Sequence, residues 1–411
     1  MDRNSPCYYA TTRILIVCCL ALGVVADPPR VPPPPCSLNG MKRSDGTCKC
    51  EKGWVGHNCG QLDLIPAAPL DKQVTSAAAT TTNNSVAWQT WGMSVVGPIN
   101  GVYHGYTTEI VNSCKLGLYG VASTVIHMEA EHPTGPWKKK GVALPVFAHN
   151  PQAIILPNGS IALYHIGTPL PSWCVGNCTG NSTHGLNPGR NTSCQTAWGV
   201  SHASSVALAE NPSGPFRRFP YIFGTRGPTN PAPLLLKNGT LLVAARRASG
   251  PVIPMYSTHW SKPEGPYEQV KTVTHTTNVS DFRRVSEQDP YFFTDANGNF
   301  HLLWQRSWPH FRINGRCGGG HDYSVDGINF FFGEPIYVNG DFTLDQMRRG
   351  QCNLTWDNQT RGNLTSRQRP TLFDDNTTGR RYIFNGASVF VDMYVHSFTM
   401  VQEVNMNDAI V

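Results

Sequence analysis

The sequence of 411 residues predicts an all-β protein, a five-bladed β-propeller preceded by a small disulfide-rich module. The first observation is a repeated hairpin pattern of an apolar run, an Asn-Gly turn and a second apolar run, as in residues 149–164. This pattern predicts a hairpin because both central residues of a type I′ turn need positive φ. Three clear and two weaker copies place turn glycines 58, 80, 59 and 81 residues apart, at Gly101, Gly159, Gly239, Gly298 and Gly379.

The second observation is a Pro-x-Gly-Pro-aromatic turn that occurs three times, at residues 133–137, 212–216 and 263–267. A repeat of more than fifty residues with several strands per unit favours radial β-architecture over a solenoid of short units. Five copies therefore predict five blades over residues 85–405. The two long intervals predict peripheral insertions, around residues 170–196 and 340–366.

Residues 1–26 are predicted to be a signal peptide. Arg3 and Arg13 precede a short apolar run, and Val24-Val25-Ala26 resembles a cleavage site. The run is too short for a comfortable bilayer crossing. We therefore expect a secreted protein with no membrane span after cleavage, with a signal anchor in the secretory pathway as the alternative. Sequons cluster at residues 177–191 and 353–376, which predicts glycosylated insertions.

A proline-rich spacer, residues 27–35, leads to a cysteine-rich segment over residues 36–59. The segment resembles the second half of an epidermal-growth-factor-like module. The resemblance implies the disulfides Cys36–Cys48 and Cys50–Cys59, since the two cysteines of the family that are absent here would pair with each other. The calcium-binding residues of that family precede the part present, so we expect no calcium.

An Ala/Thr-rich stretch, residues 60–84, is predicted to be a linker. An even number of further cysteines predicts up to three more disulfides of open connectivity. A zinc site is the alternative, but Cys174 and Cys178 have no matching Cys/His pair nearby, so neither metal nor cofactor is expected. Charged residues make up only 15% of the chain, without a long basic run, which disfavours nucleic acid as a partner. The six cysteines that could form these further disulfides are Cys114, Cys174, Cys178, Cys194, Cys317 and Cys352.

In a propeller the inner strand of each blade starts at the central channel, where polar residues can converge. Aligning the five units places there Trp91 with Gly92, His149 with Asn150, Thr229 with Asn230, Gln288 with Asp289 and Gln368 with Arg369. The second strand of each hairpin is expected to end eight residues after its glycine, at Glu109, Gly167, Arg247, Arg306 and Ala387. Such polar groups beside Trp91, Trp304 and Trp308 suit a carbohydrate.

At these positions the chain resembles the five-bladed propellers of the glycoside hydrolase family 43 type. The resemblance covers about residues 85–400 and rests on residues 109–114, 147–151, 230–233, 289–293, 319–327 and 367–370. It implies a secreted carbohydrate-active protein that hydrolyses glycosidic bonds. The family uses two aspartates and a glutamate, whereas Asn150 and Asn230 occupy two inner-strand starts here.

The resulting catalytic candidates are Asp289 as an ionised base or orienting group, Glu109 as the first choice of proton donor, and Glu287. An atypical histidine acid is a further alternative. The predicted substrate-binding residues are Trp91, His149, Asn150, Asn230, Arg247, Trp304, His321 and Arg369. Seven of these residues also have a structural interpretation: Asp289 as a cap, Asn150 and Asn230 as turn residues, Glu109 in an ion pair with Arg246 or Arg247, His149 and His321 in the core, and Arg369 bracing a blade.

Two functions remain open on this evidence. The first is a glycosidase. The second is a catalytically inactive propeller that binds glycans or protein partners at the cell surface or in the matrix, since hydrolysis normally needs two carboxyl groups. A purely adhesive protein has support only from the small module. The sugar, the linkage, the stereochemical outcome and the oligomeric state are open.

Overall fold

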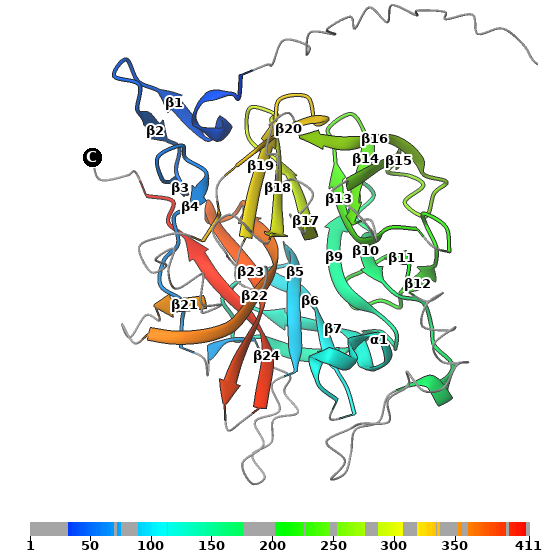
Figure 1. The fold of residues 1–411 in the computed structure, drawn as a ribbon. Helices are drawn as coiled ribbons and strands as arrows, with labels where there is room; N and C mark the ends of the chain where they lie inside the picture. The colour runs from blue at the N-terminus through cyan, green and yellow to red at the C-terminus, as the bar shows by residue number, and fades with distance from the viewer. Residues whose placement is uncertain are drawn as a thin grey trace, which may run out of the picture. The chain divides into compact units, whose positions relative to one another are not determined.

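The computed structural model describes residues 32–69, 72–74, 89–112, 114–175, 202–225, 227–246, 253–275, 287–306, 319–333, 335–337, 352–355, 361–391 and 394–407. The predicted signal peptide lies outside these residues, as does most of the first insertion. The described part of the chain forms a five-bladed β-propeller, as the repeat predicts, and the blades follow one another in chain order (Figure 1). No helix within the described ranges is long and apolar enough to cross a membrane.

Each of the first three blades is an antiparallel sheet of four consecutive strands. Blade 1 comprises β5 (Thr90–Ile99), β6 (Val102–Ile110), β7 (Ser123–Ala130) and β8 (Lys138–Leu144). Blade 2 comprises β9 (His149–Ile155), β10 (Ile161–Ile166), β11 (Ser204–Ala209) and β12 (Arg217–Phe219). Blade 3 comprises β13 (Thr229–Leu235), β14 (Thr240–Arg246), β15 (Ile253–His259) and β16 (Glu268–His275).

Blades 4 and 5 vary this plan. Blade 4 comprises β17 (Glu287–Thr294), β18 (Phe300–Arg306), β19 (Gly319–Ser324) and β20 (Asn329–Phe332), and β20 also pairs briefly with β16 of blade 3. In blade 5 the inner strand is the long β22 (Arg361–Asp375), followed by β23 (Arg380–Val391) and β24 (Tyr394–Val404). A short β21 (Cys352–Thr355) pairs with the start of β22. Short helical turns are η1 (Pro35–Leu38), η3 (Leu116–Leu118), α1 (Tyr119–Ala122) and η4 (Ser172–Cys174).

The predicted turns join the first two strands of each blade, but the type I′ geometry is wrong at four of them, because only Asn100 has positive φ among the residues that precede the turn glycines. All five turn glycines have φ between +70° and +85°, a region that glycine enters without steric cost. The three Pro-x-Gly-Pro-aromatic segments are also equivalent, since each joins the third and fourth strands of blade 1, 2 or 3. Both repeats therefore mark recurring positions in the blade.

Among the described residues the hydrophobic core forms six clusters, and five of them lie at the contacts between neighbouring blades, whereas the sixth packs Ile110 of blade 1 on Cys114 and Ala122 of the following connection. Met93 and Ile126 of blade 1 pack on Phe384 of blade 5, for example, and Phe292 of blade 4 lies in one cluster with Met255 of blade 3. The other three clusters join blades 1 and 2, blades 2 and 3, and blades 4 and 5. Apolar side chains fill the faces between blades, so the polar residues at the starts of the inner strands are not needed for this packing.

The segment after the cysteine-rich module covers the outer edge of blade 5. Leu64 and Val74 bridge to β24, and backbone hydrogen bonds join Ile65 to Glu403 and Asp63 to Asn405. These contacts satisfy backbone groups that an exposed edge strand would leave unpaired. Part of the predicted linker is therefore bonded to the propeller.

The module contains β1 (Gly40–Lys42), β2 (Cys48–Cys50), β3 (Trp54–Val55) and β4 (Gln61–Leu62). Its two predicted disulfides are confirmed, Cys36–Cys48 and Cys50–Cys59. Outside the module, Cys114 and Cys174 each take part in a disulfide bond. Trp54 is 4% exposed and lies in the cluster between blades 4 and 5, with its ring centroid 4.8 Å from that of His321.

We expect Trp54→Ala to lower the free energy of unfolding by about 3–5 kcal/mol, the usual cost of removing a buried aromatic side chain. Trp173→Ala is the matched control, because Trp173 is 60% exposed. Chemical denaturation of both variants measures the difference. Equal stability of the two variants would show that Trp54 does not hold the module against the propeller.

Candidate functional site

The five inner strands share one unusual backbone position. Its φ values lie between +51° and +61°, in the left-handed region, at Gly92, Asn150, Asn230, Asp289 and Arg369. In every blade the pairing of the first two strands shifts at this point. These are the positions that the alignment of the five internal repeats places at the channel. The structure therefore confirms that they are equivalent.

The residue types partly explain this conformation. Glycine adopts positive φ freely, and Asn and Asp tolerate it better than other side chains. Arg369 has neither property, and four of the five positions precede a proline, which restricts the backbone further. A residue held in this region costs on the order of 1–3 kcal/mol, a strain that is typical of functional sites.

Side chains from these positions form a hydrogen-bonded group on the propeller axis, which we call the axial cluster: Asn150, Asn230, Asp289 and Arg369. Asp289 Oδ1 accepts hydrogen bonds from Asn230 Nδ2 at 2.6 Å and from Asn150 Nδ2 at 3.2 Å. Asn150 Nδ2 also donates to Asn230 Oδ1 at 3.2 Å. These bonds tie blades 2, 3 and 4 together at the axis.

Arg369 completes the cluster from blade 5. Its Nη1 lies 3.7 Å from Asp289 Oδ1, and its Nη2 donates to the backbone carbonyl of Asn150. A Cβ atom at Gly92 would lie 2.8 Å from Cγ of Arg369. Blade 1 therefore contributes space, where the other blades contribute polar groups.

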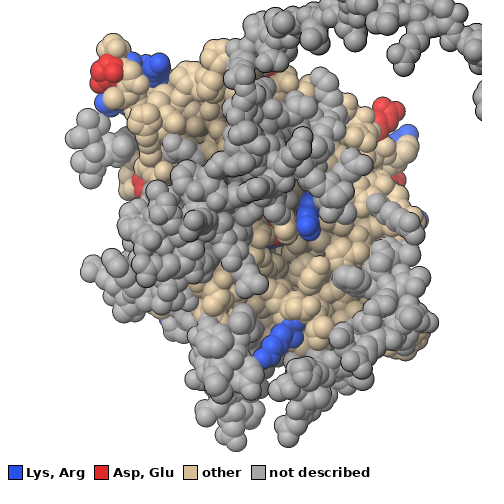
Figure 2. All heavy atoms as spheres, viewed as in Figure 1, with Lys and Arg blue, Asp and Glu red and all other residues tan. Residues whose placement is uncertain are grey.

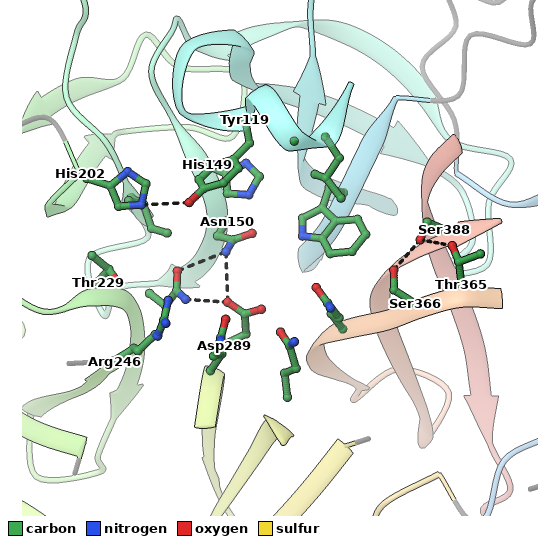
Figure 3. A pocket seen from close by; sticks show the side chains of 18 residues that line it. Tyr119, His149, Asn150, His202, Thr229, Arg246, Asp289, Thr365, Ser366 and Ser388 are labelled. Carbon is green, nitrogen blue, oxygen red and sulfur yellow. Dashed lines mark hydrogen bonds between the residues drawn. The ribbon is translucent and has the colours of Figure 1, made fainter. Parts of the chain in front are cut away.

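The axial cluster borders a pocket of about 490 Å³, a volume suited to a small ligand. In Figure 3 Asn150 and Asp289 meet near its centre, Tyr119 and His202 lie on one side, and Thr365, Ser366 and Ser388 lie on the other. The lining includes the residue before each left-handed position, namely Trp91, His149, Thr229, Gln288 and Gln368. The rest of the lining is Leu116, Gly117, Tyr119, Asn150, Ile166, His202, Asn230, Arg246, Asp289, Gln305, Thr365, Ser366 and Ser388.

The second strand of each hairpin turns a different residue toward the pocket from the one predicted. The residue paired with the lining residue of the inner strand lies seven positions after the turn glycine, not eight; examples are Ile166, Arg246 and Gln305. Successive side chains of a strand point to opposite faces, so an error of one residue reverses the assignment.

Glu109 shows the consequence. It lies eight positions after Gly101, and its carboxylate is bound by Lys139 Nζ, with both oxygens at 2.8 Å. The side chain is buried but does not line the pocket. The predicted proton donor is therefore in an ion pair within blade 1, as the structural interpretation allowed, although its partner is Lys139 and not Arg246 or Arg247.

Two further predicted site residues are Arg247 and Glu287. Arg247 lies outside the described residues, and its neighbour Arg246 lines the pocket. Glu287 begins β17, two residues before Asp289, and its side chain lies outside the described part of the chain.

His321 and Trp304 were predicted at the site, but the structure places both elsewhere. His321 Nε2 lies 2.9 Å from His301 Nδ1, and the ring centroids of His301 and His321 lie 6.2 Å and 4.8 Å from that of Trp54 in the cysteine-rich module. Trp304 is fully buried in the cluster between blades 3 and 4. Both residues are channel candidates by sequence position, but alternation turns their side chains toward neighbouring chain segments.

His149 lies in the pocket wall as predicted, with Nδ1 3.0 Å from Ser123 Oγ. Burial, Arg369 and His202 hold the pKa of His149 well below its usual range. Tyr119 Oη lies 3.3 Å from His202 Nε2, and burial followed by Arg246 lowers the pKa of His202 to about 4. Both histidines are therefore neutral near pH 7. The prediction missed Tyr119 and His202, which belong to connections between strands and not to the hairpin repeat.

Burial raises the pKa of the Asp289 carboxyl, whereas Arg369, Arg246 and the hydrogen bond from Asn230 oppose this shift. The direction differs from the one that the neighbouring cations alone would give. Asp289 Oδ2 makes no hydrogen bond with any described residue and is not among the fully enclosed polar atoms. One carboxylate oxygen is thus anchored and the other is open to a ligand.

One group of possible metal ligands lies outside the pocket, in blade 1. His104 Nδ1 is 3.0 Å from His127 Nε2 and 3.8 Å from a carboxylate oxygen of Glu129. Lys140 is bound to the same carboxylate at 3.0 Å. The same pair of strands in blade 4 carries a similar histidine pair, His301 and His321, which indicates a recurring packing device.

We expect Gly92→Ala to destabilise the axial cluster for two reasons. The new methyl group would contact the side chain of Arg369, and an alanine at this position would have to adopt positive φ. Gly101→Ala is the matched control, since its φ is also positive and its Cβ would meet nothing within 4 Å. Thermal unfolding should show a larger loss for Gly92→Ala, by about 1–3 kcal/mol. An equal loss in both variants would mean that the contact with Arg369 carries no cost.

The fold should lose stability in mild acid. Burial lowers the pKa of His127 to about 4, so the unfolded chain binds a proton more readily than the folded chain below pH 6.5. The contribution of neutral His127 to the free energy of unfolding is complete above pH 6.5 and is lost as pH falls toward 4. At pH 5 the loss is about 2 kcal/mol. Denaturation at pH 7 and pH 5 should show a smaller loss for His127→Gln than for the exposed control His57→Gln.

Comparison with known proteins supports the fold. No family model and no curated protein matches the chain. Among solved structures, a candidate exo-beta-1,3-galactanase from Bifidobacterium bifidum s17 matches with a TM-score of 0.51 at 11% identity, over 84% of this chain and 94% of that one. A family 117 glycoside hydrolase from Zobellia galactanivorans matches with a TM-score of 0.48 at 14% identity, over 86% and 92%. The chain thus has the fold of a five-bladed propeller that glycoside hydrolases also adopt.

Proposed function

We propose that the chain is a secreted carbohydrate-active protein, a glycosidase that binds its sugar in the axial pocket. The observation that carries this proposal is the state of Asp289. Its Oδ1 is fixed by two amides and Arg369, and its Oδ2 remains open to a ligand. A carboxylate held this way accepts a proton or a hydroxyl hydrogen bond from one direction.

The rest of the lining suits a sugar. Amide groups of Gln288, Gln305 and Gln368 and the hydroxyl groups of Thr365 and Ser366 can both donate and accept hydrogen bonds. The ring of Trp91 offers an apolar face against the CH groups of a pyranose. Structural relatives that include glycoside hydrolases support the same conclusion through their fold.

In the proposed reaction Asp289 accepts a proton from water, whose oxygen forms a bond to the anomeric carbon as the glycosidic bond breaks. The raised pKa of Asp289 makes it a stronger base than an exposed aspartate. A second group must protonate the leaving oxygen. We assign this role to Glu287, the acidic residue two positions before Asp289, because Glu109 is bound by Lys139.

A second candidate function is glycan binding without hydrolysis. It has the support of one specific observation: among the described lining residues Asp289 is the single carboxylate, and two equivalent positions carry Asn150 and Asn230. In this function the axial cluster would recognise a sugar hydroxyl through Asp289 Oδ2.

The test is turnover of a panel of aryl glycosides. We expect Asp289→Asn and Glu287→Gln each to lower kcat/KM at least about a hundredfold, the scale for loss of a general acid or base. Glu109→Gln is the matched control: it should lower the melting temperature, because Lys139 loses its partner, and retain turnover.

Retained turnover in Asp289→Asn would contradict the proposed mechanism. An inactive wild-type protein that binds glycans would favour the second function. Loss of turnover in Glu109→Gln would restore the role first predicted for Glu109.

A further inference from the structure

The pocket carries one positive charge that no described residue neutralises. Arg246 comes from the end of β14 and lines the pocket beside Thr229 (Figure 3). Among the described residues it forms no ion pair and no hydrogen bond, in contrast to Arg369, which is bound to Asp289. Its guanidinium group therefore has its donors available to a ligand.

The other ionisable groups of the described lining do not offset this charge. Asp289 is the one carboxylate there, and it is already paired with Arg369 at 3.7 Å. His149 and His202 are neutral near pH 7. Asp289, Arg246 and the neighbouring Arg369 together carry a formal charge of about +1 at neutral pH, since Asp289 and Arg369 compensate each other.

Arg246 is also close enough to act on the centre of the pocket. Its charge lowers the pKa of His202, and it opposes the effect of burial on the pKa of Asp289 and of Tyr119. These three residues surround the proposed sugar position. A ligand group bound by Arg246 would therefore lie in the same pocket as Asp289.

We propose that the axial pocket selects a sugar that bears an oxyanion, a carboxylate or a sulfate ester, and that Arg246 binds this group. The planar guanidinium group matches two oxygens of either anion through paired hydrogen bonds. This inference rests on the proposed function, because it names the class of sugar that the same pocket accepts.

The chain as a whole is also basic, with a formal net charge of +6 at pH 7. On the face seen in Figure 2, basic and acidic side chains are few and scattered among uncharged residues. A control variant must therefore separate an effect of Arg246 from an effect of net charge.

The test is calorimetric titration of the intact protein with four methyl glycosides: galactoside, galacturonide, the methyl ester of that galacturonide, and galactoside 6-sulfate. We expect wild type to bind at least one charged sugar about tenfold or more tightly than the galactoside. Binding of the galacturonide but not of its methyl ester would show that the recognised group is a carboxylate. Tighter binding of the galactoside 6-sulfate would show that it is a sulfate ester.

Two variants locate the effect. In Arg246→Gln the ratio of charged to neutral affinity should fall to about one. Lys237→Gln removes the same charge from the exposed turn at the other end of β14 and should keep the wild-type ratio. An equal fall in both variants would assign the preference to net charge and overturn the role of Arg246.

The outcomes also separate the two proposals. If wild type binds the neutral galactoside as tightly as the charged sugars, the pocket is a sugar site and the oxyanion proposal is wrong. If none of the four sugars binds and no aryl glycoside is hydrolysed, both proposals fail.

Discussion

The structure depends on the hydrogen-bonded group at the propeller axis. Five equivalent residues begin the inner strands in a left-handed conformation, and the side chains of four of them bind to one another there. Four of these residues are not glycine and pay a conformational cost on the order of 1–3 kcal/mol each. The contacts around Asp289 and Arg369 offset that cost, since hydrogen bonds to charged groups are stronger than neutral ones. The same backbone strain that directs these side chains inward also makes them available to a ligand.

Much of the fold could be predicted because its signals are local. Four Asn-Gly turns and one Thr-Gly turn, each between two apolar runs, mark five hairpins, and their spacing shows where each blade begins. Alignment of the units then places Asn150, Asn230, Asp289 and Arg369 at one site, since equivalent positions in a propeller meet at the axis. The disulfides of the small module followed from its likeness to a known pattern.

The errors come from features that spacing alone does not determine. The bulge at each left-handed residue shifts the pairing of the inner strand with the next, so the pocket receives Arg246 and loses Glu109. Side chains along a strand alternate between two faces, so a shift of one residue in the register reverses which residues face the pocket. His321 was misplaced because the sequence does not reveal that Trp54 of the preceding module packs on it. Tyr119 and His202 lie on connections, which no repeat describes.

The chemistry of the site comes from differences among five positions that share one backbone conformation. Gly92 gives room to Arg369, Arg369 neutralises Asp289, and Asn150 and Asn230 hold one oxygen of that carboxylate. If all five positions carried acids, their mutual repulsion in so buried a site would leave few of them ionised. With one acid, two amides, one guanidinium and one glycine, the cluster anchors Asp289 Oδ1 and leaves Asp289 Oδ2 open. That internal balance is also what leaves the charge of Arg246, which stands on the second strand and outside the cluster, for the ligand to neutralise.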